Sequence, residues 1–146
     1  SYSSMRFVPA SEITNGAKNS TIRLNQFTVL DATAGTGVGL LFNARSTGAN
    51  TTRDMARVSG VWTDPTDATR SAAITFDTVD QAGALTERAR IHAAGGFQLV
   101  GIVFASLGAP ADGTLIYCPD CTIANPCAGA GTGAFAKRLN GAWICN

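Results

Sequence analysis

The chain has 146 residues and a mass of 15.0 kDa, the size of one domain or of two small units that share partners. Its formal net charge is +1 and only 14% of its residues are charged, so it offers no basic surface to nucleic acid or to an anionic membrane. No apolar run reaches the roughly 20 residues that cross a bilayer. We therefore expect no nucleic-acid partner and no membrane insertion.

Hydrophobic residues make up 45% of the chain, but many of them are alanines, and 16 glycines accompany them. A chain with so few bulky side chains gains by burying surface against copies of itself. Residues 1–20 are polar and contain the breakers Pro9 and Asn15-Gly16, which predicts an N-terminal arm or linker. Because the chain begins at Ser1 and not at Met, we expect a fragment or a processed product.

Residues 21–110 form a series of short extended segments separated by turns. In the first segment, residues 21–30, the apolar positions change face near Asn25, which predicts a bulge or a kink. The apolar run 38–44 is short enough to favour a buried strand, residues 55–62 alternate like a strand, and 96–104 predicts a near-continuous apolar strand. Every helical window is interrupted by Gly or Pro, so the predicted fold class is all-β.

The stretch 74–91 has the pattern of a hairpin. Ile74 and Phe76 share one face, residues 79–84 form a Gly-containing turn, and alternation resumes from Leu85. The stretch resembles the repeat that precedes the chaperone domain in phage tail fibres and tailspikes. The matching residues are Phe76, Thr78, Thr86, Glu87, Arg88, Arg90 and Ile91.

This resemblance implies a homotrimer in which strands of three chains form an intertwined β-prism or triple β-helix. Large apolar residues would fill layers at the threefold axis, while Gly and Ala would allow close approach. Residues 111–146 resemble the small caps that end some phage and bacterial surface fibres, through Gly133, Ala134, Ala136, Arg138, Gly141 and Trp143. The Ser and Lys dyad of the self-cleaving chaperone is lacking, so no autoproteolysis is expected.

The expected organisation is therefore an arm over 1–20, a β-rich fibre or stalk segment over 21–110 and a Cys-rich cap over 111–146. Within the cap, Asn140-Gly141 separates the apolar runs 134–139 and 142–145, which is a strong signal for a tight hairpin.

All the cysteines lie in the cap, at Cys118, Cys121, Cys127 and Cys145. Two structural disulfides are favoured, because the count is even and the expected compartment is extracellular. Zinc is the alternative, although the second pair lacks the Cys-x-x-Cys spacing, and free thiols are a third possibility. Of the three pairings that four cysteines allow, we favour Cys121 with Cys127 and Cys118 with Cys145.

Catalytic motifs are missing from the sequence, so we expect no enzyme and no cofactor. The sole histidine, His92, has no second histidine to form a relay, and a solvated turn residue is favoured. Four acidic residues lack the spacing of a calcium loop and are interpreted as turn residues: Asp64, Asp67, Asp77 and Asp80. The aromatic residues Trp62, Tyr117 and Trp143 are candidates for receptor contact, against a core position for both tryptophans.

The expected function is that of a structural and adhesive fibre protein, the trimeric stalk and tip of a phage tail fibre or a similar host-recognition appendage. It would be extracellular or part of a virion and would contact a cell-surface glycan or protein. A bacterial secreted surface fibre or filament subunit is one alternative. A monomeric carbohydrate-binding or hydrolytic β-sandwich is the other.

Overall fold

The computed structural model describes residues 2–7, 22–27, 32–47 and 51–146, with the backbone alone for the first two of these ranges. The chain divides into two compact units, Ser1–Phe97 and Gln98–Asn146. The described residues are mostly β-strands, and their only helical segment is the 3-10 turn Phe104–Ser106. The predicted all-β class is confirmed. The three functional parts expected from the sequence stay a prediction, because a division by contacts does not test them.

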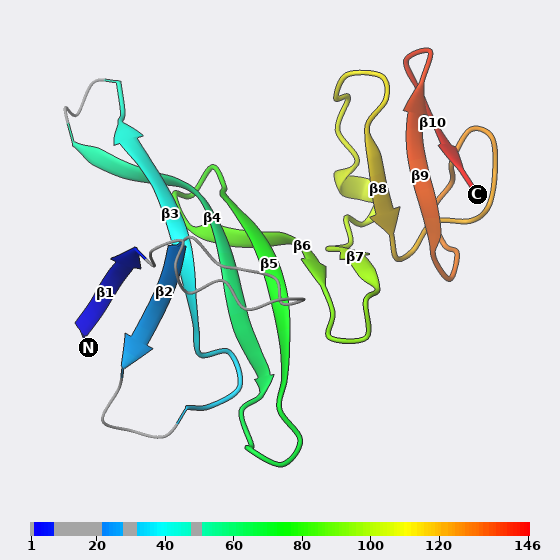
Figure 1. The fold of residues 1–146 in the computed structure, drawn as a ribbon. Coiled ribbons are helices and arrows are strands. Elements are labelled where there is room, and N and C mark those ends of the chain that lie inside the picture. The colour runs from blue at the N-terminus through cyan, green and yellow to red at the C-terminus, as the bar shows by residue number, and fades with distance from the viewer. Residues whose placement is uncertain (1, 8–21, 28–31, 48–50) are drawn as a thin grey trace. The chain divides into compact units, whose positions relative to one another are not determined.

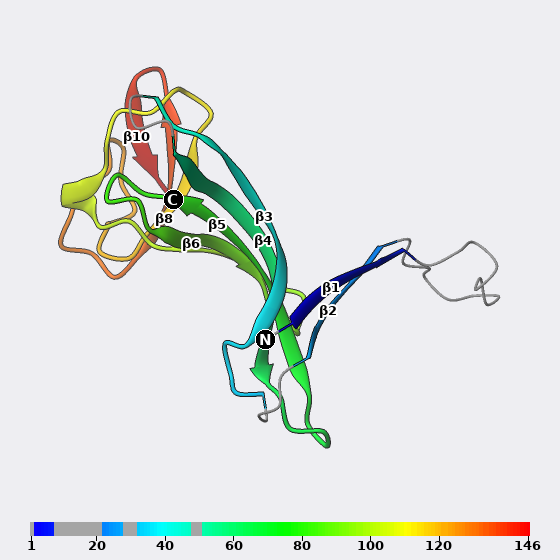
Figure 2. The ribbon, with the colours of Figure 1, turned by 90° about the vertical axis from the view of Figure 1, so that its left-hand side faces the viewer.

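The first unit contains a two-stranded sheet and most of a five-stranded one, both antiparallel where their register is defined (Figure 1). In the smaller sheet, β1 (Tyr2–Phe7) pairs with β2 (Ile22–Phe27). The larger sheet has the order β3-β4-β5-β6-β7, so each strand lies beside its neighbour in sequence. Its bounds are β3 Gly37–Arg45, β4 Thr52–Asp64, β5 Ser71–Val79, β6 Leu85–Ile91 and β7 Phe97–Leu99. Figure 2 shows β3 to β6 as a curved layer.

The hairpin predicted over 74–91 is confirmed as β5 and β6. Its turn is organised by Asp80, whose carboxylate accepts hydrogen bonds from the backbone N–H groups of Ala82 at 2.9 Å and Ala84 at 3.0 Å. The hydroxyl of Thr86 donates to the same carboxylate at 3.0 Å. These donors, the Ala84 N–H first, lower the pKa of Asp80 from its ordinary value of 3.8. The turn is therefore a property of local sequence chemistry.

Three strand predictions need correction. The run 38–44 is a strand, but its burial was wrong, because Leu40, Leu41 and Phe42 are all about half exposed. The strand expected over 96–104 ends at Leu99, and beyond it the Ile102 N–H donates to the Tyr117 carbonyl of β8 (Leu115–Cys118) instead of extending β7.

The irregularity predicted near Asn25 is also wrong, because β2 pairs with β1 in unbroken register from residue 22 to residue 27. The remainder of that segment, residues 28–30, lies outside the described residues. The register shifts occur in the large sheet instead, at Phe42/Asn43, Trp62/Asp64 and Phe76/Asp77. Each shift places an extra residue in one strand, which increases the local bend of the sheet.

The second unit contains a three-stranded antiparallel sheet in the order β10-β9-β8, with β9 at Ala134–Leu139 and β10 at Ala142–Cys145. The Asn-Gly hairpin is confirmed, since Leu139 pairs with Ala142 and the two turn residues have φ values of 50° and 73°. The core consists of small residues, the four cysteines with Ala134 and Ala136. Trp143, Ile116 and Leu107 pack against it.

Candidate interaction surfaces

One face of the sheet β3–β6 is apolar and open. Residues paired across neighbouring strands share a face, and the register places Leu40, Val58, Phe76 and Ala89 in one row and Val38, Gly60, Ile74 and Ile91 in the next. The large side chains in these rows that are exposed retain between 36% and 48% of their accessible surface. A sheet normally turns its apolar face to a core, and here no described segment covers it.

The open face is uneven, with bulky and small residues side by side. Gly60 lies between Val38 and Ile74, and a methyl group added to it would meet nothing within 4 Å. Ala89 lies opposite Phe76 in the adjoining row. Ala89 is itself buried, so the open position is the one at Gly60, where a bulky side chain of a facing surface would fit beside Val38 and Ile74.

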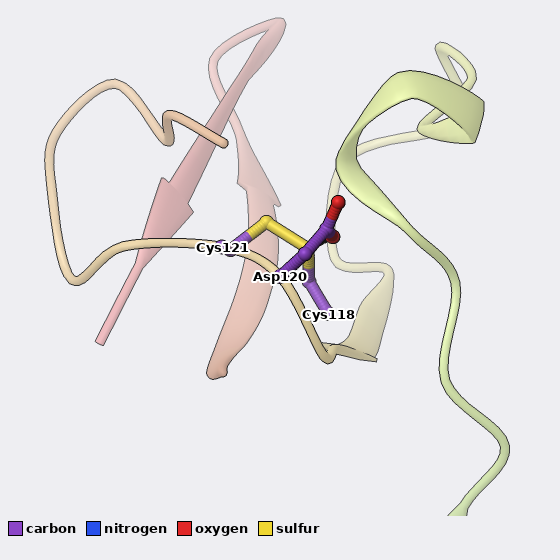
Figure 3. Close-up of side chains that lie close together, drawn as sticks. All are labelled: Cys118, Asp120 and Cys121. Carbon is purple, nitrogen blue, oxygen red and sulfur yellow. Dashed lines mark hydrogen bonds between the residues drawn. A yellow bond between two sulfur atoms is a disulfide. The ribbon is translucent and has the colours of Figure 1, made fainter. Parts of the chain in front are cut away.

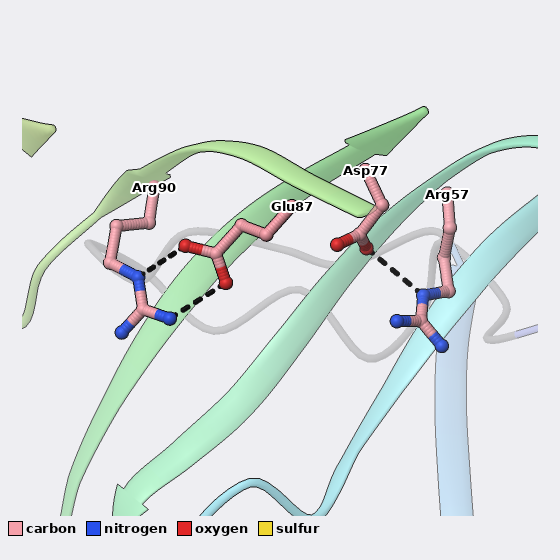
Figure 4. A network of polar contacts seen from close by, with 4 residues as sticks. All are labelled: Arg57, Asp77, Glu87 and Arg90. Atoms are coloured by element: carbon pink, nitrogen blue, oxygen red, sulfur yellow. Dashed lines mark hydrogen bonds and ion pairs between the residues drawn. The ribbon is translucent and has the colours of Figure 1, made fainter. Parts of the chain in front are cut away.

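The opposite face is polar and is covered by its own long side chains (Figure 4). Along β5 this face carries Ala73, Thr75 and Asp77, all buried, between the exposed residues of the apolar face. Asp77 was interpreted as a turn residue, which is wrong, because it lies within β5; its side chain is 5% exposed and its carboxylate accepts a hydrogen bond from the Arg57 guanidinium at 3.0 Å. The usual arrangement of an antiparallel sheet is thus reversed, with polar groups buried and apolar groups open.

A second ion pair lies on the same polar face. Arg90 contacts both carboxylate oxygens of Glu87, at 2.5 Å and 2.6 Å. The hydrogen bonds from Arg90 lower the pKa of Glu87, and the same contact raises the pKa of Arg90. Glu87 pairs across the strands with Asp77, so two carboxylates stand opposite each other and each is neutralised by its own arginine. Charge pairing therefore makes this face suited to contact with solvent.

The cysteines of the second unit form two disulfides, Cys118–Cys121 and Cys127–Cys145. Disulfide formation agrees with the expectation, but the favoured pairing was wrong. Cys118 ends β8 and reaches Cys121 across a single turn, while Cys145 on β10 lies beside the loop that carries Cys127, whose N–H donates to the Trp143 carbonyl. These placements follow from the tertiary structure, which spacing alone does not convey.

Figure 3 shows Cys118, Asp120 and Cys121 close together, an arrangement that resembles a metal site in composition. The two sulfur atoms are joined in a disulfide and carry no thiolate charge for a cation. The Asp120 carboxylate accepts hydrogen bonds from the Phe104 N–H at 2.7 Å. The group is therefore a structural staple that holds the segment around Phe104 to the end of β8.

The aromatic residues expected to contact a receptor lie in different surroundings. Trp62 of β4 lines a cavity of about 260 Å³ with residues of β3. Tyr117 packs edge to face with Phe135 at 5.7 Å between ring centroids. The Trp143 ring lies 5.9 Å from the Arg138 guanidinium carbon, and its indole N–H donates to the Gly108 carbonyl at 2.8 Å. Tyr117 and Trp143 belong to one unit and Trp62 to the other, and their receptor roles stay predictions.

The three-stranded sheet of the second unit also has an exposed outer face. Cross-strand pairing groups Leu115 with Lys137 and Tyr117 with Phe135, on the side opposite the cysteine core. Leu115, Phe135 and Leu139 are exposed. Sequence analysis did not identify this face, although the alternation of Ala134, Ala136 and Arg138 with these bulky residues was the signal for it.

The remaining candidates form no catalytic arrangement among the described residues. His92 lies in the turn after β6, where its N–H donates to the Gly96 carbonyl. Asp64 accepts hydrogen bonds from Thr69 and Thr66, which lower its pKa, and Asp67 pairs with Arg70. The described part of the chain contains no helix long and apolar enough to span a membrane. No family model, curated protein or solved structure matches this chain.

Proposed function

We propose that this protein is a structural and adhesive fibre segment that assembles as a homotrimer outside the cell or on a virion. The open apolar face of β3–β6 is the observation that carries the proposal. In the trimer, this face of each chain packs toward the threefold axis, and the polar face with its two ion pairs points outward. The trimer would be a β-prism or a triple β-helix, as the resemblance of residues 74–91 to tail-fibre repeats suggests.

The energetics favour cover by further copies of the chain. Complete burial of a large apolar side chain contributes about 1.5–3 kcal/mol. Covering the exposed fraction of Leu40, Phe76 or Ile74 would therefore contribute about 0.5–1.5 kcal/mol for each side chain. Summed over three chains, these side chains contribute about 4.5–13.5 kcal/mol, which is comparable with the marginal stability of a single domain, about 5–15 kcal/mol. A monomeric β-sandwich would need a second sheet over this face, and the exposures leave the face open.

The experiment compares two adjacent leucines on opposite faces of β3. Leu40 lies in the row with Val58 on the apolar face, and Leu41 pairs with Arg57 on the polar face. Their exposed fractions are 48% and 47%, so the two substitutions remove equal exposed surface from the isolated chain. We expect native mass spectrometry and light scattering to give a trimer for the wild-type chain and for Leu41→Asp, and a monomer for Leu40→Asp.

A monomeric wild-type chain would contradict the proposal. If Leu40→Asp and Leu41→Asp changed the oligomeric mass equally, the apolar face would not be the surface that forms the trimer. An open series of higher oligomers would instead favour the filament subunit. Far-ultraviolet circular dichroism of each variant is the control for folding.

The adhesive part of the proposal assigns receptor contact to the outer face of the second unit, where Phe135 and Leu115 are exposed and Tyr117, partly buried, packs against Phe135. Labelled wild-type trimer should bind a glycan array or intact host cells, and Phe135→Ser should reduce that binding without changing the oligomeric mass. Binding that is unaffected by Phe135→Ser would remove this face from the proposal. A trimer that binds no surface would leave a structural role alone.

A further inference from the structure

The second unit contains an apolar groove on the side of its sheet that faces the disulfide core. The groove has a volume of about 480 Å³ and is lined mainly by Ile102, Leu107, Ala109, Pro110, Ile116 and Trp143. This volume lies within the range of ligand sites, roughly 300–1,000 Å³. A mostly aliphatic lining on this scale is suited to hydrophobic side chains.

The polar side-chain groups that line the groove are already engaged within the unit. The indole N–H of Trp143 donates to the Gly108 carbonyl at 2.8 Å, and the hydroxyl of Thr114 donates to the Ala111 carbonyl at 2.7 Å. A sugar needs several hydrogen-bond partners to replace the water that it loses on binding. The groove therefore favours an aliphatic side chain over a glycan.

The same unit presents an aliphatic side chain that is left almost uncovered. Ile123 is 75% exposed, the highest value among the large hydrophobic residues that the structure describes. The backbone on both sides of it is fixed, because the Thr122 N–H donates to the Ala128 carbonyl at 2.8 Å, and Ala124 exchanges two hydrogen bonds with Cys145. Ile123 is thus a rigid protrusion, which loses little conformational entropy when it binds.

The protrusion and the groove are different patches of the unit, although Trp143 of the groove belongs to β10, the strand with which the loop of Ile123 pairs. Through Ala124 and Cys145, the loop of Ile123 pairs with β10, one edge of the three-stranded sheet. Ile102, at one end of the groove, pairs through its N–H with Tyr117 of β8, the other edge. A contact between two different patches is heterologous, and it closes into a ring when successive chains are related by a threefold rotation.

We propose that Ile123 of each chain inserts into the Trp143 groove of the next chain and links three C-terminal units in a closed ring. The inference rests on the proposed trimer. It adds a second contact, formed by residues other than those of the apolar face of β3–β6, and it assigns the groove to a copy of the chain rather than to a receptor.

The test places the photoreactive amino acid benzoylphenylalanine at position 123 of the full-length chain. Equal amounts of ¹⁴N and ¹⁵N protein are unfolded, refolded together, irradiated and digested for mass spectrometry, so that links between chains are distinguished from links within one chain. We expect mixed-isotope links from position 123 to peptides that contain residues 102–116 or Trp143. The same amino acid at Phe135, an exposed residue on the outer face, is the matched control and should give no link to the groove.

A second variant fills the groove. Ala109→Trp should reduce the mixed-isotope link from position 123 by at least tenfold, while non-reducing peptide mapping shows both disulfides intact. A trimer in which position 123 links to other regions, or only within its own chain, would overturn this inference and leave the proposed fibre standing. A monomer with no links between chains would overturn both proposals.

Discussion

The two disulfides of the second unit should contribute unequally to its stability. The Cys127–Cys145 bridge spans 18 residues of sequence and the Cys118–Cys121 bridge spans 3. In the chain-entropy account, closing loops of these lengths in the unfolded chain stabilises the folded state by about 3 kcal/mol and about 1.6 kcal/mol, respectively. We therefore expect loss of the longer bridge to lower the free energy of unfolding by about 1.5 kcal/mol more than loss of the shorter one.

The substitutions should be to alanine, in pairs. All four cysteines are buried, and serine would place hydroxyl groups in a core of cysteines and alanines, which costs about 1–3 kcal/mol for each unsatisfied group. Each double alanine variant removes two buried sulfur atoms, so the packing loss is similar in both and the difference between the variants reports the loop.

The assay uses the two tryptophans, one in each unit. In a Trp62→Phe background, Trp143 is the only tryptophan, and it packs against the disulfide core, so its fluorescence follows unfolding of the second unit. Urea titrations at one protein concentration would give the free energy of unfolding for the parent and the two double variants. Equal losses for the two variants, or a larger loss for the shorter bridge, would refute the reasoning.

Three further predictions concern the first unit, each measured by urea unfolding at fixed protein concentration. Gly39→Ala should destabilise the first unit strongly, because the new methyl group would stand 2.6 Å from the Val58 carbonyl oxygen. Gly60→Ala is the control: its methyl group would meet nothing within 4 Å in the isolated chain, so it should not change the free energy of unfolding of the monomeric Leu40→Asp variant. Equal effects of the two substitutions would contradict the close approach of β3 and β4. Asp80→Ala should destabilise the β5–β6 hairpin by removing three acceptor contacts, with Asp80→Asn losing less, and a neutral Asp80→Ala would show that the turn forms without the carboxylate. Since the pKa of Asp80 is lower in the folded state than its ordinary 3.8, its contribution to stability should be constant above about pH 5 and be lost as the pH drops through and below 3.8. Asp80→Asn should therefore make the fall in stability at low pH less steep.

Local chemistry predicted much of the strand pattern. Alternation from Ile74 to Ile91 and the Asp80 turn gave the β5–β6 hairpin, and Asn140-Gly141 gave the turn between β9 and β10. Both signals act within a few residues, through side-chain alternation and backbone conformations that the turn residues favour. The strand expected over 96–104 failed because Ile102 finds its partner in Tyr117, a contact that no local pattern encodes.

By itself, the amino-acid sequence determined that this chain forms short antiparallel strands and that its cysteines gather in a C-terminal unit. Only the tertiary structure decided which face of a strand is covered and which cysteines meet. The apolar run around Leu40 predicted a buried strand, yet register with β4 and β5 placed Leu40 on an open face and Leu41 on the opposite one, and both stay about half exposed. Burial and disulfide pairing depend on which strands become neighbours, and that is a property of the whole fold. The hydrophobicity of a residue gives the free energy that its burial would contribute, but not whether another segment covers it. Likewise, two cysteines form a disulfide only where the fold brings them close together.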